Sequence, residues 1–452
     1  MKRPAYPAYK DSGIEWLGEI PEHWSAISVK KCYEIRLGKM LQNNPNSDDD
    51  RLVPYLKALH VLWYEVCTSD LPVMWASSFD LRQYEVRDGD LLVCEGGEVG
   101  RSAIVFNPPN NCIIQNALHR VRGFNRADVG FLMYTLHAVS NSGWFDVLCN
   151  KATIAHFTHE KFSDLRIPKP PIPEQRAIAA FLDRETARID GLIEKKQRQI
   201  ELLQEKRAAL ISHAVTKGLD PNAKMKDSGI EWLGDIPEEW VVMRIKKLGR
   251  IRYGLGEPPN YVDNGLPFIR ATDINRGKID LDKVKKVEPE DIPWSRKPIL
   301  NIDEILVVRS GAYTGDSAIV TESIAGCVAG YDMVLTIENG LAEFFAWVLL
   351  SKYMLYGQIY LERMRAAQPH LNAEELGSFI VLTPPISEQH SIVAFLNQET
   401  VRIDGLINKV GESMTLLREY RTALISAAVT GKIDVRGEDK LTPSRKVAKE
   451  NT

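Results

Sequence analysis

Long apolar runs, paired cysteines and a large excess of one charge are all missing from this sequence of 452 residues. No apolar run approaches the roughly 20 residues that a membrane-spanning helix needs. The first residues, MKRPAYPAYKDSG, contain no apolar segment, so we expect no signal peptide. The net charge of −3 counts mildly against a protein that coats nucleic acid without regard to sequence. These absences predict a cytoplasmic protein with no membrane partner.

Motifs that hold metal ions are also missing. The six cysteines form no CxxC pair and no even set within either half of the chain, which fits a reducing compartment and argues against a structural zinc site. They are Cys32, Cys67, Cys94, Cys112, Cys149 and Cys327. The nine histidines form no HExxH motif and no cluster with cysteine or aspartate. We therefore expect no metal site.

A long internal repeat dominates what is present. The segment 171–220 begins PIPEQRAIAAFLDRETARIDGLIEK, and the segment 385–434 begins PISEQHSIVAFLNQETVRIDGLINK. The two align without a gap, and more than half of their residues are identical. A repeat of this length means that the protein consists of two copies of one unit.

The rest of each half repeats less faithfully. Each half opens with a nearly identical motif, KDSGIEWLGEIPEHW from Lys10 and KDSGIEWLGDIPEEW from Lys226, which we expect to pack as an irregular arm on its own domain. A β-rich region follows, in which 87–105 pairs with 301–320 as strand, glycine-rich turn and strand. After an aromatic helical stretch, His156 lies opposite His370. A duplicated scaffold with divergent modules indicates one kind of task performed on two different targets.

These segments predict five regions. They are a first globular domain at 1–170, a central helix at 171–219, a second globular domain at 220–384, a C-terminal helix at 385–434 and a disordered charged tail at 435–452. The predicted fold class is α+β: two mixed α/β domains related by a pseudo-twofold axis and separated by two long antiparallel helices.

The two helices carry the 4-3 spacing of a coiled-coil seam. The apolar seam positions are Ile189, Ile193, Ile200, Leu203 and Leu210 in the first helix, and Ile403, Ile407, Val410, Met414, Leu417 and Leu424 in the second. Lys196, Arg207 and Arg421 interrupt the seam, and their long stems can lie along it. About 40 helical residues form a rod of about 60 Å. Because the order is module, helix, module, helix, two paired helices with a module at each end must be antiparallel.

The opening DSGIEWLGEIPEHW, the strands PYLKALHV and PFIRATDI, the entries PPIPEQ and PPISEQ and the helix FLDRETARIDGLIEK are similar to those of the specificity subunits of type I restriction-modification enzymes. The resemblance covers nearly the whole chain. It implies two target recognition domains that each read one half of a split double-stranded DNA site. It also implies helices that set the spacing and dock two modification (methyltransferase) subunits. In that family the specificity subunit is not catalytic: S-adenosylmethionine serves the modification subunits, and ATP and Mg serve the restriction (translocase-nuclease) subunits.

A self-contained DNA methyltransferase or nuclease is the main alternative. The segment NPPN at 107–110 resembles the NPPY/F motif of adenine methyltransferases, but its fourth residue is Asn110 instead of an aromatic residue, so a proline turn is favoured. The segment EGGEVG at 95–100 lacks the Lys-Ser/Thr of a phosphate-binding loop and indicates a tight turn. A coiled-coil scaffold that does not bind DNA would leave the divergence of the modules unexplained.

Candidate DNA contacts are polar side chains in loops beside the predicted strands, because Arg and Lys suit guanine and Asn and Gln suit adenine. In the first module they are Lys57, Arg101, His119, Arg120, Thr153 and His156. In the second module they are Arg270, Arg309, Tyr313, Tyr331, Gln368 and His370. The sequence does not separate base contacts from phosphate contacts.

Overall fold

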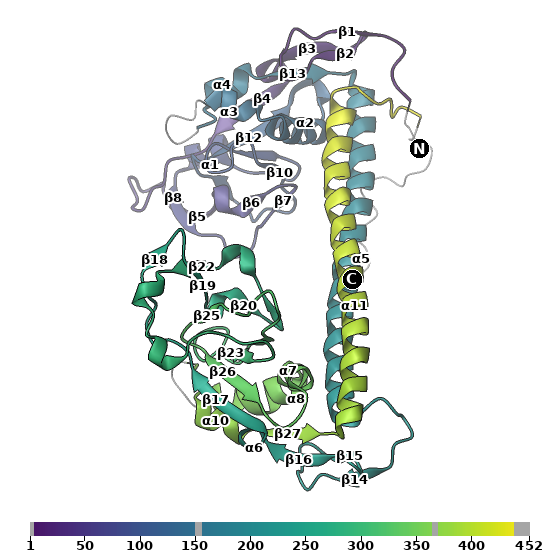
Figure 1. Cartoon of the computed structure of the whole chain (residues 1–452). Helices are drawn as coiled ribbons and strands as arrows, with labels where there is room; N and C mark the ends of the chain where they lie inside the picture. Colours follow the sequence, from purple (N-terminus) through teal and green to yellow (C-terminus); the bar gives the residue numbers. More distant parts are fainter. Residues whose placement is uncertain (1–3, 150–155, 364–368, 438–452) are drawn as a thin grey trace. The chain divides into compact units, whose positions relative to one another are not determined.

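The computed structural model describes residues 4–149, 156–363 and 369–437, which form two compact units (Figure 1). Unit 1 comprises residues 1–195 and 412–452, and unit 2 comprises residues 196–411. Each long helix is therefore divided between the units near its middle. The mixed α/β architecture with two repeated domains and two long helices agrees with the predicted fold class.

Unit 1 is built on a four-stranded antiparallel sheet in the order β10-β9-β12-β4, next to a three-stranded sheet in the order β11-β5-β8. Its strands are β1 (Tyr9–Asp11), β2 (Glu19–Pro21), β3 (Ser25–Ser28), β4 (Tyr33–Leu37), β5 (Arg51–Leu56), β6 (Val61–Leu62), β7 (Glu65–Val66), β8 (Val73–Ala76), β9 (Leu91–Cys94), β10 (Ser102–Ile104), β11 (Ile113–Ile114), β12 (Leu118–Gly123) and β13 (Arg166–Lys169). Its helices are α1 (Ser78–Tyr84), α2 (Val129–Asn141), α3 (Trp144–Cys149), α4 (His159–Asp164) and the first half of α5 (Ile172–Lys217). The end of α11 completes it.

Unit 2 repeats this plan with the sheets β17-β26-β23-β24 and β18-β22-β19-β25. Its strands are β14 (Met225–Asp227), β15 (Asp235–Pro237), β16 (Val241–Arg244), β17 (Gly249–Tyr253), β18 (Tyr261–Val262), β19 (Leu266–Ile269), β20 (Ile274–Asn275), β21 (Lys278–Ile279), β22 (Lys285–Val287), β23 (Ile305–Val307), β24 (Ser317–Ile319), β25 (Val328–Ala329), β26 (Met333–Ile337) and β27 (Ile380–Thr383). Its helices are α6 (Ile245–Leu248), α7 (Ala342–Leu349), α8 (Lys352–Met354), α9 (Tyr360–Arg363), α10 (Ala373–Ser378) and α11 (Ile386–Val429), whose first half belongs here. None of the helices within the described residues is long and apolar enough to cross a membrane.

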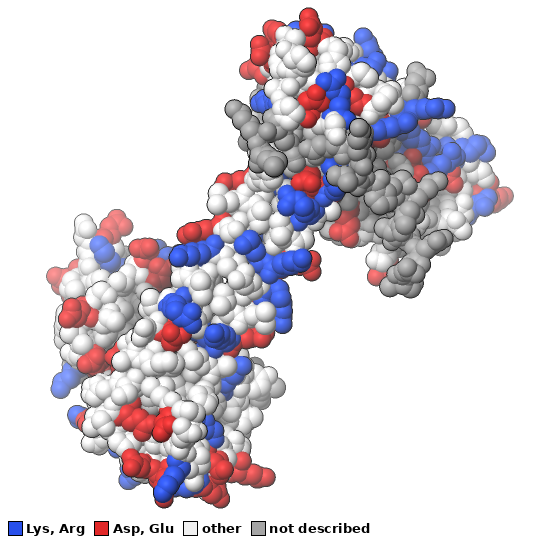
Figure 2. Space-filling view, turned by 90° about the vertical axis from the view of Figure 1, so that its right-hand side faces the viewer, with Lys and Arg blue, Asp and Glu red and all other residues white. Residues whose placement is uncertain are grey.

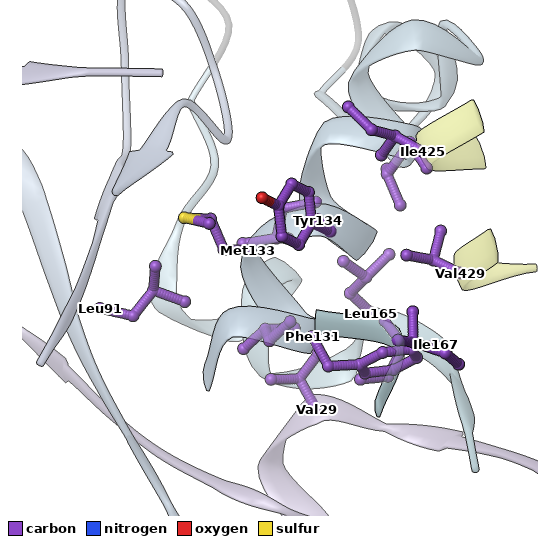
Figure 3. Close-up of a cluster of buried hydrophobic side chains, with 14 of the residues drawn as sticks. Val29, Leu91, Phe131, Met133, Tyr134, Leu165, Ile167, Ile425 and Val429 are labelled. Carbon is purple, nitrogen blue, oxygen red and sulfur yellow. The ribbon is translucent and has the colours of Figure 1, made fainter. Parts of the chain in front are cut away.

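The main core of unit 1 lies where helix α2 packs between the four-stranded sheet and helices α5 and α11. Figure 3 shows apolar side chains of this core, among them Leu91 of β9, Phe131 of α2 and Val429 of α11, and the same core includes Leu182 of α5. In unit 2 the same contact is made by Phe344 of α7 and Leu396 of α11, both fully buried. Each globular part is thus fixed to its own segment of helix by a continuous apolar core.

The repeated opening motif has a structural purpose at the start of each long helix. Trp24 is fully buried, and its Nε1 donates to Oε1 of Glu174 at 3.1 Å, in the first turn of α5. Trp240 repeats this bond to Oε2 of Glu388 in the first turn of α11, at 2.9 Å. A carboxylate in the first turn also suits the helix dipole. The predicted packing of the N-terminal arm is confirmed, since Ile20 is 1% exposed.

The two long helices pair in an antiparallel sense within each unit. In unit 1, Nε of Arg421 lies 2.9 Å from Oδ1 of Asp190; in unit 2, Nε of Arg207 lies 3.0 Å from Oδ1 of Asp404. From Asp190 to Arg207 the chain advances along α5, while the partner residues in α11 go back from Arg421 to Asp404. This order is that of an antiparallel pair, as predicted. All eleven predicted apolar seam residues are buried or half-buried. The two arginines that interrupt the seam are therefore accommodated by partners on the facing helix.

The charged faces of the helices point to solvent. The exposed residues of the run 194–199 include Glu194, Lys195 and Arg198, as expected for a solvated helix surface. Figure 2 shows Lys and Arg interspersed with Asp and Glu and with broad uncharged areas.

The predicted disordered tail begins too early. Val435 is 1% exposed, and Arg436 pairs with Asp434 at 2.6 Å and lies over the ring of Tyr6 at 4.9 Å. The packed chain therefore extends past the predicted boundary at residue 435, because this apolar side chain completes the core under the N-terminal arm. Residues 438–452 of the predicted tail lie outside the described residues.

Candidate nucleic-acid interface

Each unit contains the same turn at the end of a central strand. In unit 1 the ladder pairs Ser102 with Val93, and in unit 2 it pairs Ser317 with Val307. Two residues past these strand positions stand Glu95 and Arg309, which therefore correspond in the two units. The tight turn expected for 95–100 is confirmed, with Gly97 and Gly100 at φ 74° and 76°.

A second backbone contact ties this turn to the loop that carries the paired histidines. The amide of Phe157 donates to the carbonyl of Glu95 at 2.7 Å, and the amide of Leu371 donates to the carbonyl of Arg309 at 2.8 Å. The residue before each donor is a histidine, His156 and His370. We call this arrangement of turn and histidine loop the turn frame. It has the same hydrogen-bond pattern in both units.

In unit 2 the turn frame carries a stacked arginine. The guanidinium of Arg309 lies 4.6 Å from the ring centre of Tyr253 and 4.6 Å from that of Tyr331. Its Nη2 is 3.4 Å from Nε2 of His370. Its Nε is buried and has no hydrogen-bond partner among the described residues. Both tyrosines are more than two-fifths exposed, and Tyr313 in the same turn is half exposed. The result is a surface of π faces and a cation, which suits nucleic acid.

A buried carboxylate supports the stacked arginine from below. Oδ1 of Asp332 accepts from the amide of Arg309 at 3.1 Å, and its Oδ2 has no partner among the described residues. Burial raises the pKa of Asp332 to about 6, against the lowering effects of that bond and of the Arg309 charge. The carboxyl is 2% exposed, so it positions the turn and is not itself a surface contact.

In unit 1 the same frame carries a carboxylate. Glu95 is half-buried beside the exposed His156, and a Cβ atom at Gly96 would lie 3.8 Å from Nδ1 of that histidine. Burial raises the pKa of Glu95, and the nearby His156 opposes the shift. By strand register, Leu37 takes the place of Tyr253. The unit 1 frame therefore presents an acceptor where the unit 2 frame presents a stacked donor.

Two predicted contacts are corrected by their burial. His119 and Arg120 lie on β12, an interior strand of the four-stranded sheet, and are 0% and 3% exposed. Nε2 of His119 bonds to the carbonyl of Phe157 at 2.8 Å, and Nη1 of Arg120 donates to the carbonyl of Glu85 at 2.6 Å. Neither side chain is accessible to DNA, because helix α4 covers one and the loop after α1 satisfies the other.

Two further candidates, Arg101 and Arg270, form side-chain bonds within their own unit. Arg101 donates through Nη2 to the carbonyl of Ala58 at 3.0 Å. Lys57 and Arg270 precede equivalent short turns, and Arg270 forms a double hydrogen bond with Asp273 at 3.0 and 2.8 Å. These residues stabilise loops next to the turn frame, and the prediction that they contact DNA stays a prediction. Thr153 and Gln368 lie outside the described residues.

The structure brings together Arg309, Tyr331 and His370. In unit 1, His156 is exposed, whereas His119, which bonds to the carbonyl of the next residue, Phe157, is buried. Sequence reasoning missed Glu95 and Tyr253. Glu95 had a signal, since it stands opposite Arg309 when the two glycine-rich turns are aligned. For Tyr253 the sequence contained no signal, because only the strand pairing places its ring on the guanidinium of Arg309.

The other motifs support no catalytic centre within the described residues. The NPPN segment forms a loop between β10 and β11, with Asn107 at φ 48°, beside an open pocket lined by Glu85, Arg87 and the same prolines. Across 4–149, 156–363 and 369–437, no three His, Cys, Asp or Glu side chains lie close enough to share a metal ion.

Comparison with known proteins identifies the family. The sequence model described as "Type I restriction modification DNA specificity domain" matches residues 80–202 and 237–409, well over half of the chain. The chain belongs to this family. The two matched segments fall on the two repeated halves, so the duplication seen in the sequence is a duplication of the family's domain.

Related proteins match this chain over almost its whole length. The Escherichia coli type I restriction enzyme EcoBI specificity subunit is 25% identical over 439 residues, covering 94% of this chain and 89% of the relative. The putative MjaX specificity subunit of Methanocaldococcus jannaschii is 24% identical, covering 93% and 96%.

Solved structures show the same fold. A chain from a study of complex assembly and conformational transition of the type I R-M system has a TM-score of 0.69 at 16% identity and covers 91% of this chain and 98% of its own. The HsdS subunit of Thermoanaerobacter tengcongensis has a TM-score of 0.53 at 17% identity, with coverage of 93% and 99%.

Proposed function

We propose that this chain is the DNA specificity subunit of a type I restriction-modification complex. Unit 1 and unit 2 each read one half of a split, asymmetric DNA site. The observation that carries this proposal is the turn frame: one hydrogen-bond pattern holds Glu95 in one unit and a stacked Arg309 in the other. A shared frame with opposite side-chain chemistry suits two readers of different sequences.

The residues proposed to contact DNA are those that the frame leaves accessible. In unit 2 they are Arg309, Tyr313, Tyr331 and His370, and in unit 1 His156. Lys57, Arg101 and Arg270, with Thr153 and Gln368, are proposed as flanking contacts. Tyrosine faces suit sugars and bases, and arginine suits guanine or phosphate.

The long helices are proposed to set the spacing of the half-sites and to dock two modification subunits and the restriction subunits. Their support is the continuous helix α5 of 46 residues and its repeated antiparallel ion pairs. The chain itself would need no cofactor. S-adenosylmethionine, ATP and Mg would serve the partner subunits, and the complex would act on DNA in the cytoplasm.

The test is to express the chain with the modification subunit of its own system in a host that lacks methylation, and to sequence the methylated bases. We expect methylated adenines confined to one motif with two unlike half-sites and a fixed spacer. A stable complex that methylates no motif would contradict the proposal. Methylation by the isolated chain would contradict its non-catalytic role.

A further inference from the structure

The two turn frames share a backbone and present different side chains. The frames are matched atom for atom in their backbone bonds, Phe157 to Glu95 and Leu371 to Arg309. The side chain at the shared position is a carboxylate in unit 1 and a guanidinium in unit 2. A donor and an acceptor at one geometric position cannot favour the same base edge.

Arg309 is held as a donor with a fixed plane. Two tyrosine rings at 4.6 Å on the guanidinium leave its N–H edge as the part that can form hydrogen bonds in the ring planes. Guanine presents two neighbouring acceptors, O6 and N7, which match such an edge.

Glu95 offers only acceptors when it is ionised. The major groove presents amino donors at cytosine N4 and adenine N6. Adenine also places the acceptor N7 beside its amino group, where it would face the second carboxylate oxygen, whereas cytosine has only a C–H there. Cytosine is therefore the base that fits a carboxylate on this frame.

We propose that Glu95 and Arg309 are equivalent specificity-determining residues, with Glu95 accepting from a cytosine amino group and Arg309 donating to guanine. This inference rests on the proposed DNA-reading function. It assigns a chemical preference to each half of the DNA site and predicts that each residue controls one base position.

The experiment is methylated-base sequencing of the complex of chain and modification subunit, with Glu95→Gln, Arg309→Gln and the matched exposed control Glu160→Gln. We expect each site variant to relax one base position in one half-site, cytosine for Glu95→Gln and guanine for Arg309→Gln. The loss of discrimination at that position should be about 10- to 100-fold. The two variants must affect different half-sites, and Glu160→Gln should leave the motif unchanged.

The outcomes separate this inference from the proposed function. If the unaltered complex yields no motif, the proposed function fails. If it yields a motif that neither variant relaxes, the base assignment alone is overturned. A uniform fall in methylation over all sites with an unchanged motif would mean phosphate contact and would also overturn it. Melting temperatures equal to that of the unaltered chain show that a relaxed motif does not come from misfolding.

Discussion

Unit 1 and unit 2 share the ion pairs between their long helices and differ in the side chains that the turn frame presents to solvent. The ion pairs Arg421–Asp190 and Arg207–Asp404 both join Nε to Oδ1, at 2.9 and 3.0 Å. The turn frames repeat their backbone bonds and reverse their charge. The comparison teaches that the duplicated chain has kept its supporting contacts and varied the side chains that the support presents.

The two units also differ where the globular part packs against the long helices. In unit 1 the hairpin of β6 and β7 inserts Tyr64, whose ring lies 5.3 Å from His137 and 4.7 Å from the guanidinium of Arg421. In unit 2, Gly277 takes the place of Tyr64 in the hairpin of β20 and β21. The two positions correspond because the amide of each donates to the carbonyl of a matched serine, Ser102 in unit 1 and Ser317 in unit 2. A cavity of about 520 Å³ remains there, lined by Trp347 and Leu350. Tyr64 thus fills this position in unit 1, and Gly277 leaves it open in unit 2.

Exchanging this residue should produce the largest effect on stability. Tyr64→Gly empties the filled space in unit 1 and should lower its free energy of unfolding by about 3 kcal/mol, slightly offset by relief of the positive φ of 69°. Hydrogen exchange of unit 1 amides measures the change. Tyr64→Phe, which keeps the ring, is the control. Protection that is equal in both variants would show that the ring does not stabilise the unit.

Acid should destabilise unit 1 through His119, which corresponds to Met333 by strand register. Burial lowers its pKa from 6.5 to about 4. The unfolded chain binds a proton below pH 6.5 while the folded chain does not, so stability present above pH 6.5 is lost as the pH falls toward 4. The loss is about 2 kcal/mol at pH 5. The variant His119→Met should show a flatter dependence of unfolding on pH between 7 and 5. An unchanged slope would exclude this histidine as the cause.

Unit 2 should respond in the opposite sense through Asp332. Its raised pKa of about 6 means that the folded chain holds a proton that the unfolded chain has released. Stability is therefore full below pH 3.8 and falls as the pH rises through 6. Asp332→Asn keeps the acceptor for the Arg309 amide and should stabilise unit 2 at pH 7.5 by about 1 kcal/mol. Urea unfolding at pH 7.5 and 5 checks this. A larger gain at pH 5 than at 7.5 would contradict the assigned cause.

The helices were predictable because their repeat and 4-3 spacing are local signals. The correspondence of His156 with His370 was predictable because the alignment of the two halves needs no gap there. His119 and Arg120 were misjudged because a polar pair on a short segment resembles a loop. Only the strand order shows that β12 is interior and that Phe162 lies over one of them, with rings 5.5 Å apart. The stacking of Tyr253 on Arg309 likewise depends on pairing between distant strands, which local patterns do not encode.

The most direct test of the central claim is to replace residues 25–169 with residues 241–383, so that both globular parts come from unit 2. The ends of the exchange lie on the paired strands β3 with β13 and β16 with β27, which lead into the conserved helices. Methylated-base sequencing of the complex should then show a motif whose two half-sites have the same sequence, that of the unit 2 half-site. A motif that keeps two unlike half-sites would contradict the account that each globular part reads its own half of the DNA site.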